Sequence, residues 1–344
     1  MQNLFALSPS KTKEYTQMCI QAGLVPFLQS SPGMGKSSIV KQIANEFGLQ
    51  LIDCRLSTME PCDLNGLPWF HDGKAEFQPY SFFPLEDSPV PQGKNGWILF
   101  LDEFNSASRA TQAAAYKVVL DREIGMKKLH PYCAVVAAGN KMTDGAITNK
   151  LSTAMSSRVV HLNMELNFED WRDNFALPQK IDERIIAYLS MYPEKLMEFD
   201  PDRDDQTFTC PRTWEFASKI LKTTGKTPSE IVDLIAGAIT GEQASSFAQF
   251  CKVYKDLVTL KDILADPETK CPKDKAGQWA ILIHLSTAVD AKNIEPVLTW
   301  VDKNFDKTLA ITFLRTLNAS HGSEFFSIPA YCEFTQKLAK YMLN

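Results

Sequence analysis

The chain has 344 residues, of which 44% are hydrophobic, enough to bury a large core and to divide into two or three domains. Its formal net charge of -5 and pI near 5.7 exclude a general electrostatic attraction to nucleic acid or anionic membranes, which needs clustered Lys and Arg. The eight cysteines show no zinc-ligand spacing, and we find no secretory signal and no apolar run of roughly 18 residues, so we expect a cytoplasmic protein with reduced thiols.

The first half of the chain alternates short apolar runs with helical patterns, which is typical of a parallel sheet with crossover helices. Helical spacing predicts helices over residues 37–47 and 107–121. An Asp-Gly pair between strand-like residues predicts a hairpin with its turn at Asp72 and Gly73, inserted before the third core strand. The expected core strands are 24–29, 51–55, 97–101, 134–138 and 159–164.

A change of pattern near residue 167 divides the chain. Beyond it the strand signals cease, and apolar residues recur at helical intervals, as in Ile181, Ile185 and Leu189. An acidic connection at 200–205 and a loop rich in Pro and Lys at 266–275 mark further boundaries. The expected domains are an α/β domain over 1–166 with the hairpin insert at about 63–80, a helical domain over 167–262, and a helical extension over 263–344.

A glycine-rich segment lies between the first predicted strand and the first predicted helix, which is the context of a phosphate-binding loop. Its glycines let backbone N–H groups face phosphate oxygens, Lys36 reaches the β- and γ-phosphates, and Ser37 can ligate Mg²⁺. Ser30 stands where the usual pattern has its first glycine, and serine is tolerated there if its φ stays negative. The alternative is a chance Gly-Lys-Ser at a helix start. The expected nucleotide-binding residues are Ser31, Pro32, Gly33, Met34, Gly35, Lys36, Ser37 and Ser38.

Two carboxylates follow the apolar run 98–101, at the carboxyl end of a predicted buried strand, where open α/β sheets bind ligands. Asp102 is expected to hold Mg²⁺ through water, together with Ser37, and Glu103 to polarise the attacking water as general base. The alternative is a solvated acidic turn. With a phosphate-binding loop upstream, that alternative requires two independent patterns to be accidents.

Three further polar residues are less distinctive by themselves. Asn140 follows the apolar strand 134–138, where its amide could bind the γ-phosphate or the lytic water, although a lone Asn there is more often a turn residue. Arg158 precedes the strand 159–164, and Arg212 lies at a predicted helix start. An exposed Arg is usually only a surface charge.

Taken together and in this order, these segments resemble the AAA+ ATPases with their Walker A and Walker B motifs, and the likeness is nearest to the MoxR-like family. Residues 63–66 with the hairpin resemble the family's insert in helix two, and residues 120–125 resemble its pre-sensor segment. The resemblance covers about 20–260, while the helices beyond resemble extensions of some members. The segments that carry the resemblance are 32–37, 101–105, 138–140, 157–158 and 211–212.

The resemblance implies a P-loop AAA+ core of parallel sheet and flanking helices, followed by an all-α lid and the helical extension. It implies an Mg²⁺-dependent ATP hydrolase that forms a ring, usually a hexamer, and remodels protein clients like a chaperone, often clients with a von Willebrand factor A domain. Carried over by position, Asn140 is sensor one, Arg158 the arginine finger for a neighbour's nucleotide, and Arg212 sensor two. Arg109 and Arg122 are reserve candidates for interface arginines.

More than one function is compatible with these residues. The hairpin aromatics Trp69, Phe70 and Phe77 either grip a client or pack the hairpin onto the ring body. A nucleic-acid motor is the second hypothesis, because 126–128 with Lys141 and Lys150 could form a local basic patch, although neighbouring lysines are usually a solvated turn. A third hypothesis is a switch that binds ATP but scarcely hydrolyses it, and Glu103 argues against it.

Overall fold

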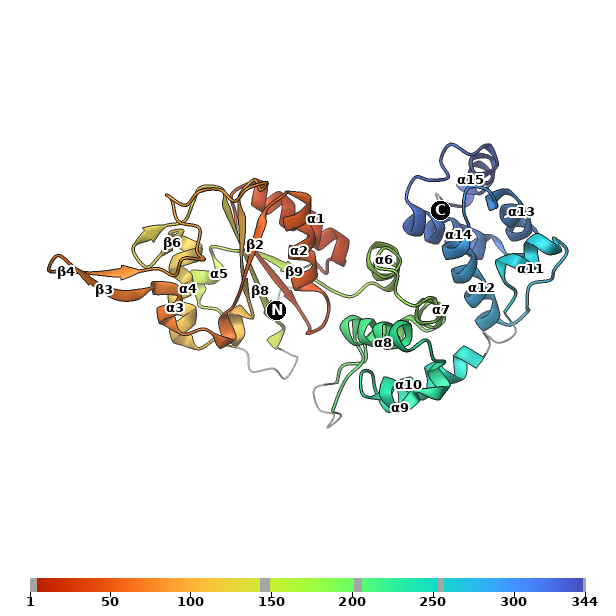
Figure 1. The fold of residues 1–344 in the computed structure, drawn as a ribbon, viewed down its shortest axis with the longest axis horizontal. Helices are drawn as coiled ribbons and strands as arrows, with labels where there is room; N and C mark the ends of the chain where they lie inside the picture. Colours follow the sequence, from red (N-terminus) through yellow and green to blue (C-terminus); the bar gives the residue numbers. More distant parts are fainter. Residues whose placement is uncertain (1–4, 143–148, 201–205, 253–256, 343–344) are drawn as a thin grey trace. The chain divides into compact units, whose positions relative to one another are not determined.

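The computed structural model describes residues 5–142, 149–200, 206–252 and 257–342. The chain forms two compact units, Met1–Leu166 and Asn167–Asn344 (Figure 1). Within the described residues, none of the helices combines the length and the apolar character needed to cross a membrane.

The first unit is built on a five-stranded parallel sheet with the strand order β2-β5-β8-β1-β9. All five predicted core strands are present, and every residue of β5 is buried, as its apolar run requires. Because the strands are parallel, the carboxyl ends of β1, β5 and β8 meet at one edge of the sheet. The strands are β1 (Pro26–Ser30), β2 (Gln50–Arg55), β5 (Trp97–Asp102), β8 (Cys133–Asn140) and β9 (Val160–Asn163).

Helices cover both faces of this sheet, with α1 and α2 on one side and α4 on the other (Figure 1). The predicted helices α2 (Lys36–Glu46) and α4 (Arg109–Leu120) are confirmed, and α2 buries Ile39, Val40 and Ile43 against the sheet. Helix α1 (Pro9–Gln21) was not predicted, and its Ser8 cap accepts a hydrogen bond from the backbone of Lys11. Short helices α3 (Pro61–Asn65) and α5 (Thr153–Ser156) complete the unit.

Two hairpins project from the first unit. β3 (Leu67–His71) and β4 (Lys74–Gln78) form the predicted hairpin, and both turn residues adopt positive φ, 48° at Asp72 and 74° at Gly73, as a tight two-residue turn requires. The second hairpin, β6 (Glu123–Ile124) with β7 (Lys127–Lys128), was not predicted, because two-residue strands carry no periodic signal. At Gly125 it packs closely against α3 and the first hairpin, because a Cβ there would lie 2.2 Å from the carbonyl oxygen of Asn65 and 3.6 Å from the Cβ of Phe77 on β4.

The second unit is helical, as predicted, and its described residues contain only one isolated bridge, between Glu198 and Thr209. Its core includes Tyr188, whose ring packs against Trp214 and Phe247 with centroids 5.7 and 5.5 Å apart. α7 packs against α12, which lies beyond the boundary predicted near residue 262, so the separation into a lid and an extension remains a prediction. The helices are α6 (Phe168–Trp171), a π-helix (Arg172–Ala176), α7 (Glu183–Met191), α8 (Pro211–Thr224), α9 (Val232–Ala236), α10 (Gly241–Phe250), α11 (Leu260–Ala265), α12 (Lys275–Ala288), α13 (Ile294–Asn304), α14 (Lys307–His321) and α15 (Pro329–Met342).

Candidate active site

The phosphate-binding loop connects β1 to α2 at the carboxyl edge of the sheet. Gly33 and Gly35 adopt φ values of 77° and 91°, the left-handed region that a residue with a side chain enters only at a cost. Ser30 is buried and does not adopt a positive φ, so serine is compatible with the position where the usual pattern has glycine. The loop therefore has the backbone conformation in which N–H groups can surround an anion at a helix start.

The ammonium of Lys36 is nearly buried, with 8% of the residue exposed, and is held by oxygen atoms of the loop. Its Nζ donates to the Ser30 carbonyl at 3.0 Å, to the Ser30 Oγ at 3.1 Å and to the Ser31 carbonyl at 3.3 Å. The Ser30 hydroxyl thus gives Lys36 an acceptor that a glycine could not supply. Lys36 Nζ also donates to Asn140 Oδ1 at 3.0 Å, so two residues 104 positions apart in the sequence meet at this edge.

Ser37 and Asp102 are in direct contact, since Ser37 Oγ donates to Asp102 Oδ2 at 2.9 Å. The other carboxylate oxygen, Oδ1, accepts a hydrogen bond of 2.8 Å from the backbone N–H of Glu103. A hydroxyl beside a carboxylate is a pair of hard oxygen ligands of the kind that Mg²⁺ accepts, with waters and phosphate oxygens completing its octahedron. The side chains present at this position therefore fit Mg²⁺.

Glu103 lies just past the end of β5 with φ 54° and ψ 35°, which costs on the order of 1–3 kcal/mol for a residue with a side chain. Its carboxylate accepts a hydrogen bond from the hydroxyl of Ser57, which follows the neighbouring strand β2. Asp53 also lies on β2. Its partial burial, and secondly the negative charge of Asp102, raise the pKa of the Asp53 carboxyl above its usual value. Ser57 and Asp53 were not predicted as site residues, because only the strand order places β2 beside β5.

Arg158 lies at the opposite end of the sheet from the phosphate-binding loop of its own chain. It precedes β9, the edge strand next to β1, and the Val160 N–H donates to the carbonyl of Val25 at the amino end of β1. Its exposed guanidinium donates to the Ala154 carbonyl at 2.9 Å and to the Ser157 hydroxyl at 3.4 Å. The structure does not bring Arg158 to the residues around Lys36.

The remaining predicted arginines differ in their surroundings. Arg109 is exposed at the first residue of α4. Arg122 has φ 54° and donates to the carbonyls of His130 and Cys133, so it ties the β6–β7 hairpin to the start of β8. Arg212 is exposed at the second residue of α8, in the helical unit, and its role at the nucleotide stays a prediction.

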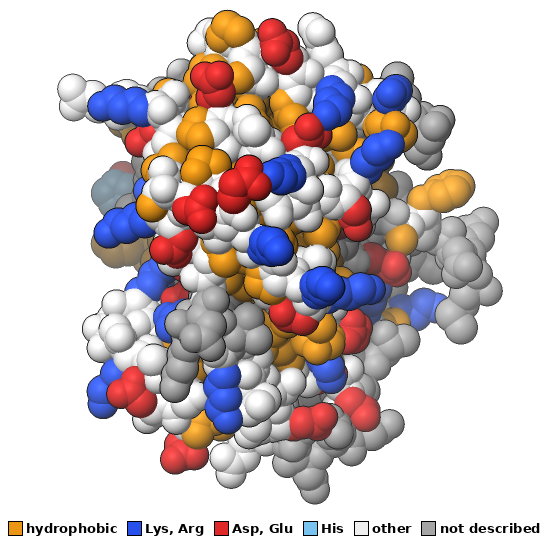
Figure 2. Space-filling view, turned by 90° about the vertical axis from the view of Figure 1, so that its right-hand side faces the viewer, with side chains coloured by type: hydrophobic (Ala, Val, Ile, Leu, Met, Phe, Trp, Pro, Cys, Tyr) orange, Lys and Arg blue, Asp and Glu red, His pale blue; other side chains and the backbone are white. Residues whose placement is uncertain are grey.

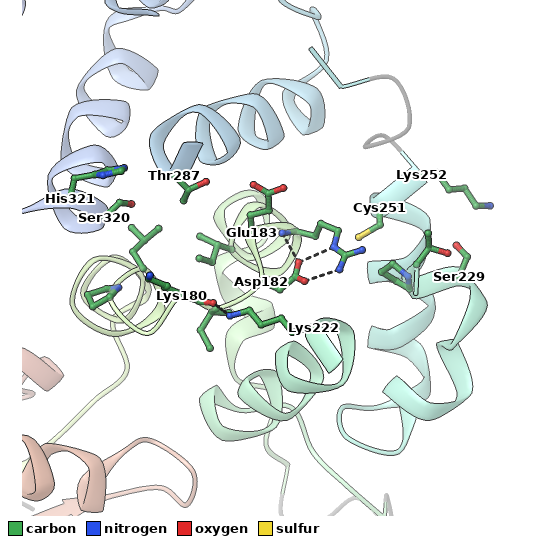
Figure 3. Close-up of a pocket in the computed structure, with 17 residues that line it drawn as sticks. Lys180, Asp182, Glu183, Lys222, Ser229, Cys251, Lys252, Thr287, Ser320 and His321 are labelled. Carbon is green, nitrogen blue, oxygen red and sulfur yellow. Dashed lines mark hydrogen bonds and ion pairs between the residues drawn. The ribbon is translucent and has the colours of Figure 1, made fainter. Parts of the chain in front are cut away.

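A cavity of about 950 Å³ lies in the helical unit and contains none of the predicted site residues (Figure 3). Its charged groups are largely paired within the chain: Arg184 donates to both oxygens of Asp182, at 2.8 and 2.7 Å, and this hydrogen bonding raises the pKa of Arg184. Glu183 lies 3.2 Å from His284 Nδ1. The conjunction of a phosphate-binding loop with acidic and amide side chains is found in the first unit, and we therefore place the candidate active site there.

Known proteins resemble the part of the chain that carries these residues. Residues 27–161, which include the strands and loops of the site, match the family described as "ATPase family associated with various cellular activities (AAA)". Midasin of Dictyostelium discoideum is 26% identical over 254 residues, a match that covers 67% of this chain but only 4% of the length of Midasin.

Solved structures that match the chain include a RuvB mutant of Thermotoga maritima and an ATPase described as putative from Cytophaga hutchinsonii. The first is 16% identical with a TM-score of 0.36 and covers 97% of this chain and 91% of its own. The second is 13% identical with a TM-score of 0.37, and the match covers 97% of this chain and 90% of the other. TM-scores of this size do not indicate a common overall arrangement. The family match and the parallel five-stranded sheet with its P-loop together show that the chain contains an AAA ATPase family domain over residues 27–161.

Proposed function

We propose that this chain is a MoxR-like AAA+ ATPase that hydrolyses ATP with Mg²⁺ in a ring, usually a hexamer, and remodels a protein client in the cytoplasm. The observation that carries the proposal is the convergence of Lys36, Ser37, Asp102 and Asn140 through two hydrogen bonds of 3.0 and 2.9 Å. These side chains come from the start of α2 and from two strand ends that are far apart in the sequence. A client with a von Willebrand factor A domain is part of the same proposal and rests on the family resemblance.

In this proposal each residue acts at a stated atom. Lys36 exchanges its contacts with the loop carbonyls for oxygens of the β- and γ-phosphates, and the N–H groups of the loop bind the same anion. Ser37 and Asp102 hold Mg²⁺, which when bound neutralises charge on the phosphates. Glu103 gives up its bond from Ser57 and accepts a proton from the attacking water. Asn140 orients that water or the γ-phosphate.

Removing the Asp102 carboxylate tests the metal site. We expect Asp102→Ala to raise the Mg²⁺ concentration for half-maximal turnover by about 10- to 100-fold, because the carboxylate beside Ser37 is lost. A titration of ATPase rate against Mg²⁺ measures the effect. Asp121→Ala is the control, since it removes an exposed carboxylate at the C-terminal end of α4. If wild type and Asp102→Ala depend equally on Mg²⁺, Asp102 is not a ligand of the metal.

The hairpin β3–β4 is the proposed client contact. All ten of its strand residues are exposed, and Trp69 and Phe70 are 61% and 77% exposed, so these rings do not pack the hairpin onto the body of their own chain. Large exposed aromatics that are not needed for folding indicate an interaction surface. This observation favours client binding over the packing alternative.

Substituting both exposed rings separates client binding from chemistry. Trp69→Ala with Phe70→Ala is expected to keep basal ATPase and to change stability by no more than about 0.5 kcal/mol, as for other surface positions. Stimulation of turnover by a protein partner, measured at saturating ATP, should be lost. Glu76→Ala, opposite Trp69 on β4, is the control that removes an exposed side chain without removing a ring. A fall in thermal stability of several degrees in the double variant would restore the packing alternative.

The structure gives less support to a nucleic-acid motor. Lys127 donates to Gln78 Oε1 at 3.2 Å, and Lys141 lies 3.4 Å from Glu165, so two lysines of the suggested patch face partners within the chain. On the face of the carboxy-terminal helices, acidic and basic side chains are interspersed (Figure 2). A positive stripe that could follow a phosphate backbone is not visible on that face.

A further inference from the structure

The turn that follows the acidic pair contacts the end of the neighbouring strand β8 through one side chain. Asn105 Nδ2 donates to the carbonyl oxygen of Asn140 at 2.7 Å, and the N–H of Asn140 donates to Asn105 Oδ1 at 3.0 Å. Both hydrogen bonds of the Asn105 amide therefore go to the backbone of a single residue. Such a two-point contact fixes the two peptide groups that flank Asn140, and with them the backbone position and orientation of that residue.

The surroundings of this contact are built to accommodate it. Asn105 is 2% exposed, so its amide must be satisfied by protein groups. A Cβ on Gly139 would lie 2.4 Å from Asn105 Oδ1 and 2.9 Å from Asn105 Cγ. Asn105 can therefore approach the end of β8 only because residue 139 is glycine. The backbone carbonyl of Asn105 also accepts a hydrogen bond from the N–H of Asn149 at 2.6 Å.

The residue that Asn105 holds is the one that reaches the nucleotide site. The Oδ1 of Asn140 accepts from Lys36 Nζ at 3.0 Å, so a fixed backbone at Asn140 sets where its amide stands relative to the lysine. Glu103 lies two residues before Asn105, at the other end of the same turn. One short turn therefore carries the proposed general base at its start and the residue that orients the amide at its end.

We propose that Asn105 is a positioning residue that holds the backbone of Asn140 and so places the Asn140 amide for ATP hydrolysis. The inference rests on the proposed function, because it assigns Asn140 a part in turnover. Asn105 itself does not touch the nucleotide. It acts through Asn140, and its removal affects turnover more than ATP binding, since Lys36 and the loop remain in place.

The first experiment compares Asn105→Ala with a matched control. Gln112 is also a buried amide, 3% exposed, and its Nε2 donates to the carbonyl of Ala107 at 3.1 Å without contacting Asn140. We expect Asn105→Ala to lower kcat on the order of 10²-fold with KM and the Kd for ATP near wild type, because a misplacement of about 1 Å has an effect of this size. Gln112→Ala should lower the melting temperature similarly and leave kcat near wild type.

A second variant protects the test against loss of folding. Asn105→Asp keeps the shape and the acceptor for the Asn140 N–H but replaces the donor that faces the Asn140 carbonyl. It should also lower kcat. In addition, Asn105→Ala should lower kcat little when placed on Asn140→Ala, because the group it positions is already gone. Wild-type kcat in both Asn105 variants would overturn the positioning role. So would a double variant whose loss of kcat equals the product of the losses in Asn105→Ala and Asn140→Ala.

A third measurement does not depend on ATP turnover. Hydrogen exchange of the Asn140 amide should speed up about tenfold or more in Asn105→Ala, while the amide of Ala137 in the same strand exchanges as in wild type. Absence of turnover in the wild-type chain would reject the proposed function. The exchange rate would then still show whether Asn105 holds the backbone of Asn140. Unchanged exchange at Asn140 in Asn105→Ala refutes the contact whether or not the chain hydrolyses ATP.

Discussion

Glu103→Gln is expected to retain ATP binding while losing turnover by at least about 10²-fold, whereas Lys36→Ala is expected to lose ATP binding itself. The asymmetry follows from the positions of the two side chains. Lys36 Nζ is within hydrogen-bonding distance of the loop and of Asn140, where a phosphate would lie, so its charge stabilises bound nucleotide. Glu103 contacts Ser57 at the end of the next strand, and its amide replacement keeps the shape but cannot accept a proton from water.

Equilibrium binding of a fluorescent ATP analogue and steady-state phosphate release measure the two effects separately. Lys36→Arg is an informative companion to Lys36→Ala, because it keeps the charge but cannot fit the same set of three acceptors, at Ser30 and Ser31. Full turnover in Glu103→Gln would show that another group activates the water. Wild-type affinity in Lys36→Ala would place the nucleotide elsewhere in the chain.

The second large effect is expected at Arg158, which we propose acts on the nucleotide of a neighbouring subunit. Arg158→Ala should bind ATP normally and hydrolyse it on the order of 10³-fold more slowly, the contribution of a well-placed arginine in phosphoryl transfer. Arg158 cannot serve its own site: it precedes β9, while Lys36 follows the carboxyl end of β1. Pro26 is level with Val160, and the five residues from Pro26 to Ser30 span about 13 Å along β1.

Mixing two inactive variants tests this assignment. Arg158→Ala supplies an intact Lys36, and Lys36→Ala supplies an intact Arg158, so a mixed ring contains interfaces with both groups and should recover part of the activity. The rate per subunit of the wild type should also rise with protein concentration as rings form. Arg315→Ala, an exposed arginine on α14 to which no role at the nucleotide is assigned, is the control. Inactive mixtures of variants that assemble normally, or full activity in dilute monomers, would contradict the trans assignment.

Arg122 illustrates why a sequence position alone does not identify an interface arginine. It was a reserve candidate, but its guanidinium is bound to the carbonyls of His130 and Cys133 within the same unit. Replacing it would disturb the β6–β7 hairpin before it affected a neighbouring subunit. A loss of activity in an Arg122 variant would therefore need a stability measurement before it could be assigned to catalysis.

The sequence by itself determined the features whose signal is local. Short apolar runs indicated the five strands, helical spacing indicated the helices α2 and α4, and the Asp-Gly pair indicated the turn at 72–73. The phosphate-binding loop and the acidic pair were recognisable because each is a short run of residues at a strand end, with its chemistry in consecutive positions. Their partnership, seen in the contact between Ser37 and Asp102, follows from parallel strands ending at a common edge.

Only the tertiary structure decided which distant residues support this site. Ser57 reaches Glu103 because β2 lies beside β5, and Asn105 reaches Asn140 because β5 lies beside β8 and position 139 lacks a Cβ. It also decided that Trp69 and Phe70 are exposed and that Arg158 lies at the amino end of the sheet. Residue type and spacing carry no information on strand order or on the approach of two backbones, because these depend on how separate elements pack, and packing is a property of the whole fold.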